Sequence, residues 1–134
     1  MAYTTYTSFV AALHALSVTD VTRSFAYPPA QLNTSGLPTK YIRLNTTGNV
    51  LSTFDGGVGL RIGVADVVIV VMPTEQSNPA AIYTLLTATM DNLTAALEAA
   101  TLSIGLDSWS LAASIEGIGN TDYYVVTATV EASG

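Results

Sequence analysis

The sequence predicts a single α+β domain in which a mainly antiparallel sheet packs against two helices. Three observations lead to this fold class: two segments carry apolar residues at helical spacing, several others alternate apolar and polar residues, and 134 residues is the length of one domain. The expected order is α-β-β-β-α-β-β, with no internal repeat and no linker, so residues 1–134 form one domain.

The first helix is expected over Thr4–Leu16, with Thr4 or Thr5 as its N-cap. Its apolar residues recur at three- and four-residue spacing and form one face: Tyr6, Phe9, Val10, Leu13 and Leu16. The next segment alternates loosely, which predicts a short strand around Thr22–Phe25.

A proline-rich stretch, PPAQLNTSGLPTKYIRL, covers residues 28–44. Prolines cannot donate sheet hydrogen bonds, so the stretch is expected to begin as a loop outside the core and to continue as a strand over Lys40–Asn45. Turns are expected at Thr46–Asn49 and at Phe54–Gly57. The run from Gly56 to Gly63 lacks the spacing of a phosphate-binding loop and precedes a strand, which indicates a glycine-rich β-hairpin that could contact a partner.

The longest strand is expected over Val58–Met72. Its VVIVV run is apolar at every position, which predicts burial on both faces and a central place in the sheet. Arg61 and Asp66 are expected to mark the end of this strand that lies nearer to solvent.

Asn78 followed by Pro79 is a strong helix start, and the second helix should run to about Ala100. Two alternating segments, Ser108–Ile115 and Tyr123–Glu131, then predict a terminal hairpin with its turn at Gly117–Asn120. One stripe of the helix is apolar and should pack on the sheet: Ile82, Leu86, Met90, Leu93, Leu97 and Ala100.

The charge pattern indicates contact with another protein. Charged residues make up 10% of the chain, few for a free soluble monomer, although a Thr/Ala-rich proteome would give the same composition. The net charge is -6, yet no cation follows residue 61. The basic part of one copy could therefore dock on the acidic part of the next and close a ring, or the segregation is chance. All four cations lie in the first half: Arg23, Lys40, Arg43 and Arg61.

The sequence gives little support to catalysis. Without cysteine there is no thiolate metal site and no cysteine nucleophile, and no metal or cofactor is expected. His14 is the only histidine and is expected to be a structural residue on a helix flank; a Ser-His-Asp triad stays open in principle, but no G-x-S-x-G elbow is present. The sequence contains no basic run or stripe, so nucleic-acid binding is not expected as the main role. No secretory signal and no membrane-spanning run is found.

Several strings together resemble the small tail terminator, or tail completion, proteins of long-tailed bacteriophages and gene-transfer particles. The resemblance covers nearly all of the chain and is one of pattern. It rests on a Pro-containing loop after a short helix and strand, a glycine-bearing segment before an apolar strand, an Asn-Pro helix start and a terminal hairpin: FAYPPAQLNTSGLPTKYIRL, FDGGVGLRI, VADVVIVVMP, SNPAAIYTLLTATMDNLTAALEA and WSLAASIEGIGNTDYYVVTATVEA.

The resemblance implies a structural virion protein, not an enzyme. Such a protein forms a homohexameric ring at the head-proximal end of the tail tube, stops tube polymerisation and joins the tail to the head-side connector, with DNA passing through the lumen. It implies assembly in the host cytoplasm and no catalytic residues, cofactor or membrane. Stopper and other neck proteins share the pattern, and a small ligand-binding or enzymatic α+β domain remains a second hypothesis. The candidate interface residues are Lys40, Arg43, Phe54, Asp55, Gly56, Gly57, Arg61, Glu75 and Glu116.

Overall fold

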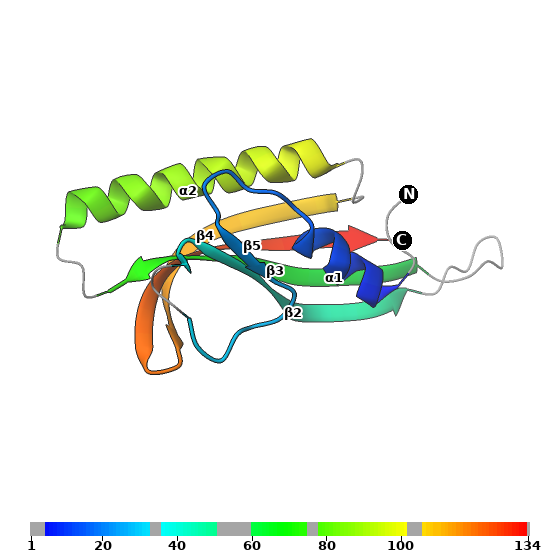
Figure 1. Cartoon of the computed structure of the whole chain (residues 1–134). Helices are drawn as coiled ribbons and strands as arrows, with labels where there is room; N and C mark the ends of the chain where they lie inside the picture. Colours follow the sequence, from blue (N-terminus) through cyan, green and yellow to red (C-terminus); the bar gives the residue numbers. More distant parts are fainter. Residues whose placement is uncertain (1–4, 33–35, 51–59, 75–77, 102–105, 134) are drawn as a thin grey trace.

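The computed structural model describes residues 5–32, 36–50, 60–74, 78–101 and 106–133, and for residues 46–50, 60–62 and 133 it describes the backbone alone. Its elements follow the predicted order α-β-β-β-α-β-β and form one α+β domain with a five-stranded sheet (Figure 1). The elements are α1 Tyr6–His14, β1 Arg23–Phe25, β2 Thr39–Val50, β3 Leu60–Pro73, α2 Pro79–Ala100, β4 Leu106–Ile118 and β5 Thr121–Ser133.

The strand order in the sheet is β1-β2-β3-β5-β4. β1 pairs with β2 in parallel, and every other pair is antiparallel. β3 is central, and its VVIVV run is at most 3% exposed because both faces of this strand are covered. The predicted central strand is therefore confirmed.

Both helices pack on the same face of the sheet, here called the helix-side face (Figure 1). α1 begins with a capping box, in which the Thr5 hydroxyl accepts from the Ser8 N–H and the Ser8 hydroxyl accepts from the Thr5 N–H. α2 begins as predicted, with the Asn78 side chain accepting from the Ala81 N–H and Pro79 at the first helical position. The predicted apolar faces of the two helices are thus placed on one core, which includes Phe9, Leu13, Val67, Ile69, Leu93, Leu97, Val126 and Val130.

The opposite face, here called the loop-side face, carries a second apolar cluster. Tyr41, Val68 and Val125 are nearly fully buried there, with Leu32 and Leu37 of the proline-rich loop packed against them. The prediction that this loop lies outside the core is therefore wrong. Its prolines prevent strand pairing, but its leucines cover a sheet face that the helices leave bare.

The tip of the β4–β5 hairpin bends away from the helices (Figure 1). A two-residue turn at Gly119 and Asn120 joins paired Ile118 and Thr121, and Gly119 has a φ of 64°. A positive φ at the first position of such a turn favours glycine, which has no Cβ. A Cβ on Gly119 would lie 3.2 Å from the carbonyl oxygen of Ala30, so the tip touches the proline-rich loop.

Two further predictions of local structure are corrected. The turn expected at Thr46–Asn49 is strand instead, because β2 continues to Val50 beyond a register shift between Leu44 and Thr46. Asp66, expected near the solvent end of its strand, is 5% exposed in the middle of β3. At Thr46–Asn49, pairing with β3 outweighs the Gly-Asn turn signal. Asp66 can be buried because neighbouring side chains donate hydrogen bonds to it, as described below.

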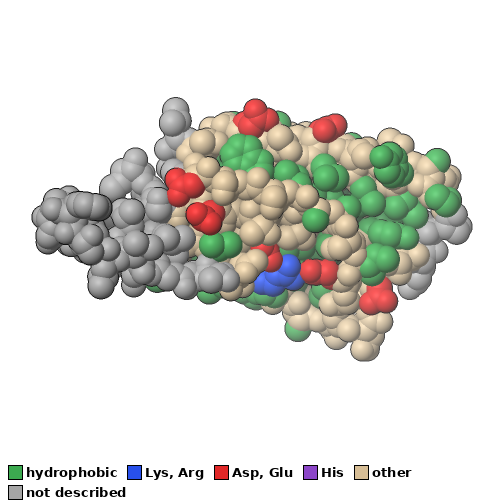
Figure 2. Space-filling view, turned by 180° about the vertical axis from the view of Figure 1, so that it is seen from behind, with side chains coloured by type: hydrophobic (Ala, Val, Ile, Leu, Met, Phe, Trp, Pro, Cys, Tyr) green, Lys and Arg blue, Asp and Glu red, His purple; other side chains and the backbone are tan. Residues whose placement is uncertain are grey.

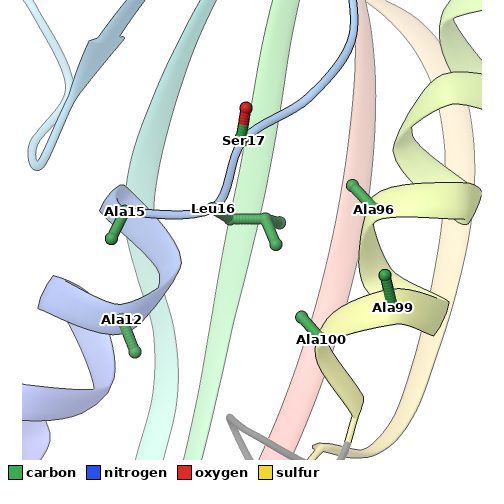
Figure 3. Close-up of a pocket in the computed structure, with 7 residues that line it drawn as sticks. All are labelled: Ala12, Ala15, Leu16, Ser17, Ala96, Ala99 and Ala100. Carbon is green, nitrogen blue, oxygen red and sulfur yellow. The ribbon is translucent and has the colours of Figure 1, made fainter.

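One small group of basic atoms is seen on the face of the molecule shown in Figure 2, and it lies between acidic side chains. On the helix-side face, a hollow of about 470 Å³ lies between the C-terminal ends of the two helices, with small side chains around Leu16 (Figure 3). This hollow contains no charged side chain and no histidine.

Candidate functional site

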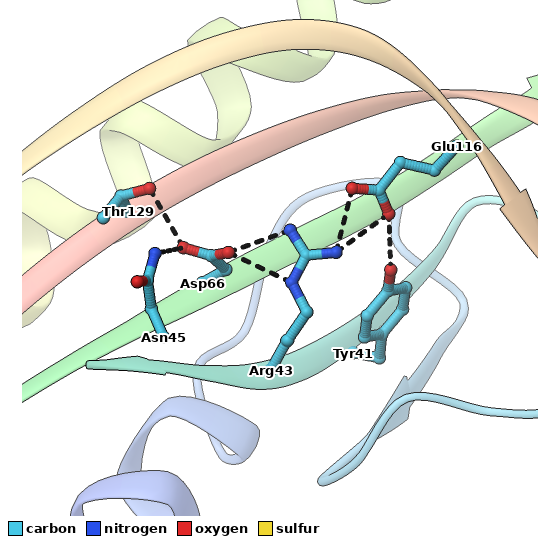
Figure 4. A network of polar contacts seen from close by, with 6 residues as sticks. All are labelled: Tyr41, Arg43, Asn45, Asp66, Glu116 and Thr129. Atoms are coloured by element: carbon cyan, nitrogen blue, oxygen red, sulfur yellow. Dashed lines mark hydrogen bonds and ion pairs between the residues drawn. The ribbon is translucent and has the colours of Figure 1, made fainter. Parts of the chain in front are cut away.

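Arg43 is the centre of a polar network on the loop-side face (Figure 4). It lies directly opposite Asp66 in the pairing of β2 with β3, and its Nη2 and Nε donate to Asp66 Oδ2 at 2.8 and 3.1 Å. Its Nη1 donates to both carboxylate oxygens of Glu116, at 2.9 and 3.1 Å. A single guanidinium therefore joins two carboxylates of its own chain, a use suited to its planar set of donors.

Asp66 is the buried end of this network. Besides Arg43, the Asn45 amide and the Thr129 hydroxyl donate to Asp66 Oδ1 at 3.1 and 3.0 Å. Burial alone would raise the pKa of Asp66, but the hydrogen bonds from Asn45, Arg43 and Thr129 outweigh it and hold the pKa below its usual value. Asp66 is therefore a satisfied structural carboxylate rather than a proton-exchanging group.

Glu116 brings the tip of the hairpin into the same network. The Tyr41 hydroxyl donates to Glu116 Oε2 at 2.8 Å. The pKa of Tyr41 is raised, mainly by burial and also by this hydrogen bond. Burial works against the charge on Arg43, but its hydrogen bonds to Glu116 and Asp66 raise its pKa. Side chains from β2, β3, β4 and β5 are thus tied together across the bent hairpin.

Lys40 has a different role and points to the helix-side face. It is 1% exposed, and its Nζ donates to the main-chain carbonyls of Leu13, His14 and Leu16 at 2.7, 3.1 and 2.5 Å. These carbonyls lie at the C-terminal end of α1, where backbone acceptors lack helical partners and a cation is favoured. Burial lowers the pKa of Lys40 to about 8.

His14 contacts a serine. The Ser24 hydroxyl lies 3.0 Å from His14 Nδ1 and 3.2 Å from the His14 carbonyl oxygen. No carboxylate contact to His14 is found among the described residues, so the described part of the chain holds a Ser-His pair without the third member of a triad. The Ser24–His14 contact joins the end of α1 to β1. It is consistent with the structural role predicted for His14.

Two adjoining hollows lie near His14, beyond the end of β1. One of about 400 Å³ and one of about 330 Å³ share Val10, Ala26 and Leu44 as lining residues. The first is otherwise lined by α1 residues, and the second by Tyr27, Pro28, Ile42 and Arg43. Leu44 and Tyr27 are 58% and 63% exposed, so apolar surface is open to solvent where the proline-rich loop leaves the sheet.

The structure places the predicted interface residues in different environments. Lys40 is buried, so the prediction that it lies on a contact surface is wrong. Arg43 and Glu116 pair with each other within one chain, so each has an internal partner. Arg61 lies in β3 opposite Asn49, and its side chain is not described. The remaining candidates lie outside the described residues: Phe54, Asp55, Gly56, Gly57 and Glu75.

Sequence reasoning missed most of the network. The available signals were a lone aspartate inside the apolar run VADVVIVV and an arginine on the preceding strand. A buried carboxylate in such a strand requires donors from its neighbours. The register that brings Asn45, Thr129 and the distant Glu116 to Arg43 and Asp66 could not be obtained from the sequence.

No family model matches the chain, and a search of the curated proteins found no match to its sequence. Within the described residues, no group of three His, Cys, Asp or Glu side chains is placed to hold a metal ion. No described helix combines the length and apolarity that crossing a membrane requires.

Proposed function

We propose that this chain is a structural ring subunit at the head-proximal end of a long-tailed phage tail tube, where it stops polymerisation and joins the tail to the head-side connector. The observation that supports the proposal most is the element order. The sequence resemblance implied a short helix and strand, a loop, a central apolar strand, a second helix and a terminal hairpin, and the fold has this order.

The placement of charge also supports a contact between copies. Six of the described acids after residue 62 lie on α2, β4 and β5, and Asp66 lies on β3. Lys40 is buried and Arg43 is paired with Asp66 and Glu116 within the chain, so Arg23 on β1 is the one cation with a described side chain that is left for another copy. A contact between this arginine and the acidic side of the next copy would be head-to-tail. The working ring is proposed to be a hexamer, in the virion, with DNA passing through its lumen.

The test is polymerisation of the tail-tube protein encoded by the same genome. With this chain present, tubes should stop growing, and electron microscopy should show an added ring at one end of each tube. Tubes that grow equally long with and without the chain, or a genome without a tail-tube gene, would contradict the proposal. Binding to the head-side connector without binding to the tube would support the stopper alternative.

A second candidate function is a small ligand-binding or enzymatic domain, favoured by the Ser24–His14 contact near an apolar hollow of about 400 Å³. The variants His14→Ala and Ser24→Ala separate the two candidates. In a ring subunit both variants should still cap tubes if they fold, whereas a catalytic site would lose a measurable hydrolytic activity in both. Full tube capping together with no activity in the wild-type protein would dismiss this second candidate.

A further inference from the structure

The two outer strands of the sheet differ in how well their free edges are protected. β1 has 3 residues and is soon followed by Pro28 and Pro29, so it offers little backbone for further pairing. β4 has 13 residues, and β5 is the one described strand that pairs with it. From Ser108 to Ile118 this pairing has no register shift, and β4 contains no lysine, arginine or proline. β4 therefore lacks the features that usually discourage the addition of another strand.

The edge of β4 is accessible from outside. On the helix-side face Trp109 and Leu111 pack on the core, but the strand then leaves the cover of the helices. The four consecutive residues Ala112–Ile115 are all exposed, although they alternate between the two faces of the sheet. Ile115 is 57% exposed, so a strand added beside it would also remove apolar surface from water.

Short side chains on the loop-side face of β4 leave room for longer ones on an added strand. Ser110 lies opposite Thr129, whose hydroxyl donates to Asp66, and Ala112 and Ser114 follow on the same face. Ser108 lies opposite Glu131 of β5. An added strand would lie about 10 Å from β5, twice the spacing between strands, so a lysine or arginine on it could extend over Ser108 towards Glu131.

α2 adds acids on the side of the edge. Its Asn92 side chain donates to the Thr19 carbonyl oxygen in the connection after α1, so the side of α2 that carries Asn92 faces α1. α2 also contacts β4, which lies on the other side. At 100° per residue, Asp91 and Glu98 lie on the outer part of the side turned away from Asn92, towards β4.

Charge decides between two kinds of occupant for this edge. Four exposed acids on α2 and β5 form no ion pair with a described residue: Asp91, Glu98, Asp122 and Glu131. A second copy of the chain, with its net charge of -6, matches them poorly, because Lys40 is buried and Arg43 is paired internally. Among the cations with described side chains, only Arg23 is left to meet them. Charge complementarity thus favours a basic segment of a different protein.

We propose that the open edge of β4, from Ser108 to Ile118, binds an extended basic segment of a partner protein by strand addition. Backbone hydrogen bonds to β4 hold the segment, and its lysine or arginine side chains meet the acids on β5 and α2. An apolar residue of the segment packs beside Ile115. This inference goes beyond the ring function and does not depend on it, since it requires neither a ring nor a tail tube.

The test uses three synthetic peptides of about ten residues, the length of a long strand. The first alternates lysine and valine, the second alternates glutamate and valine, and the third is the first peptide with every amide nitrogen methylated. The lysine-valine peptide should bind the full chain with a Kd below about 1 mM. It should slow amide hydrogen exchange between Ser108 and Ile118 more than in any other described strand. The other two peptides should not bind at this concentration, because one has the wrong charge and the other has no backbone donors.

Matched variants of exposed alanines test the position of the site. Ala112→Lys puts a cation on the β4 edge and should weaken binding of the lysine-valine peptide about tenfold or more, whereas Ala112→Glu should strengthen it. Ala88→Lys is the control, since Ala88 is exposed on the side of α2 that carries Asn92 and the charge change is the same. Its Kd should stay within about twofold of the wild-type value.

The proposal is overturned if the lysine-valine peptide does not bind, if its methylated form binds equally well, or if the protected amides lie outside β4. Equal Kd values for Ala112→Lys and Ala88→Lys would overturn it too. Protection of β4 that rises with chain concentration in the absence of peptide would assign the edge to a second copy and refute the basic partner. Tube capping is a separate readout: capping without peptide binding refutes this inference alone, and peptide binding without capping refutes the ring role alone.

Discussion

Arg43 contributes to stability within the chain, because it neutralises Asp66 and also holds Glu116. The sequence analysis had named Arg43 as a candidate for contact between copies. Since both partners are internal, a loss of association in Arg43→Glu would report damage to the fold and would not identify an interface.

The variant Arg43→Met should lower the free energy of unfolding by about 2 kcal/mol. The substitution leaves Asp66 buried without its cation. The expected loss of stability is reduced because 35% of the Arg43 side chain is exposed, so solvent already screens the ion pair. Urea unfolding followed by fluorescence of Trp109, the only tryptophan, measures the change. The exposed Arg23 has no ion pair among the described residues, so Arg23→Met is the control and should change stability by less than about 0.5 kcal/mol. Equal effects of the two variants would contradict this assignment.

Asp66 should make unfolding depend on acid. Its folded pKa lies below the ordinary value of 3.8, so its contribution is complete above 3.8 and is lost as the pH falls from there through the lower folded value. In Asp66→Asn, stability should therefore fall less steeply with decreasing pH in that window. Urea midpoints measured between about pH 5 and pH 2 test this expectation, and parallel curves for the two proteins would refute it.

At the scale of single elements, Lys40 anchors the C-terminal end of α1 to β2. Lys40→Met should destabilise the protein by about 2–3 kcal/mol, because three main-chain carbonyls lose a donor. Hydrogen exchange should become faster in α1 in particular. Removal of the cap at the other end of α1, in Thr5→Ala, should cost only about 1 kcal/mol. A smaller effect for Lys40→Met than for Thr5→Ala would argue against this anchoring role.

The hairpin tip depends on Gly119. In Gly119→Val a β-branched residue would adopt a positive φ and meet the Ala30 carbonyl, so we expect a loss of about 2 kcal/mol. Gly117→Ala is the comparison, since its Cβ would meet only the end of the Asp122 side chain at 3.1 Å, and its effect should stay within about 1 kcal/mol. Thermal unfolding of both variants measures these effects. An unchanged stability of Gly119→Val would mean that the tip is not held against the loop.

On the scale of the whole molecule, the excess of acids has a consequence for assembly. The net charge is -6, Lys40 is buried and Arg43 is paired within the chain, so copies of the chain repel one another at low salt. Association of the full chain should therefore strengthen as ionic strength rises from about 0.05 M to about 0.5 M, because the Debye length shrinks below 10 Å and screens this repulsion. Sedimentation velocity across this range measures it, with sucrose at matched density as the control for solvent effects. An oligomer that is insensitive to salt would show that apolar contacts outweigh charge.

The elements themselves were largely predictable. Asn78-Pro79 fixed the start of α2, and Thr5 was one of two predicted caps of α1. The continuous VVIVV run placed β3 at the centre of the sheet. These features are local, since caps, proline and periodicity act over a few residues. Where long-range pairing competes with a local signal, as at Thr46–Asn49, the local prediction was wrong.

The sequence by itself determined the fold class, the order of elements and the uneven distribution of charge along the chain. Only the tertiary structure decided where those charges act. It buried Lys40 against the end of α1, paired Arg43 with Asp66 and with Glu116, which lies 73 residues further along the chain, and left Ile115 exposed on the edge strand β4. The physical reason is that periodicity sets which face a side chain is on, whereas register and hairpin bending set which distant side chain it meets.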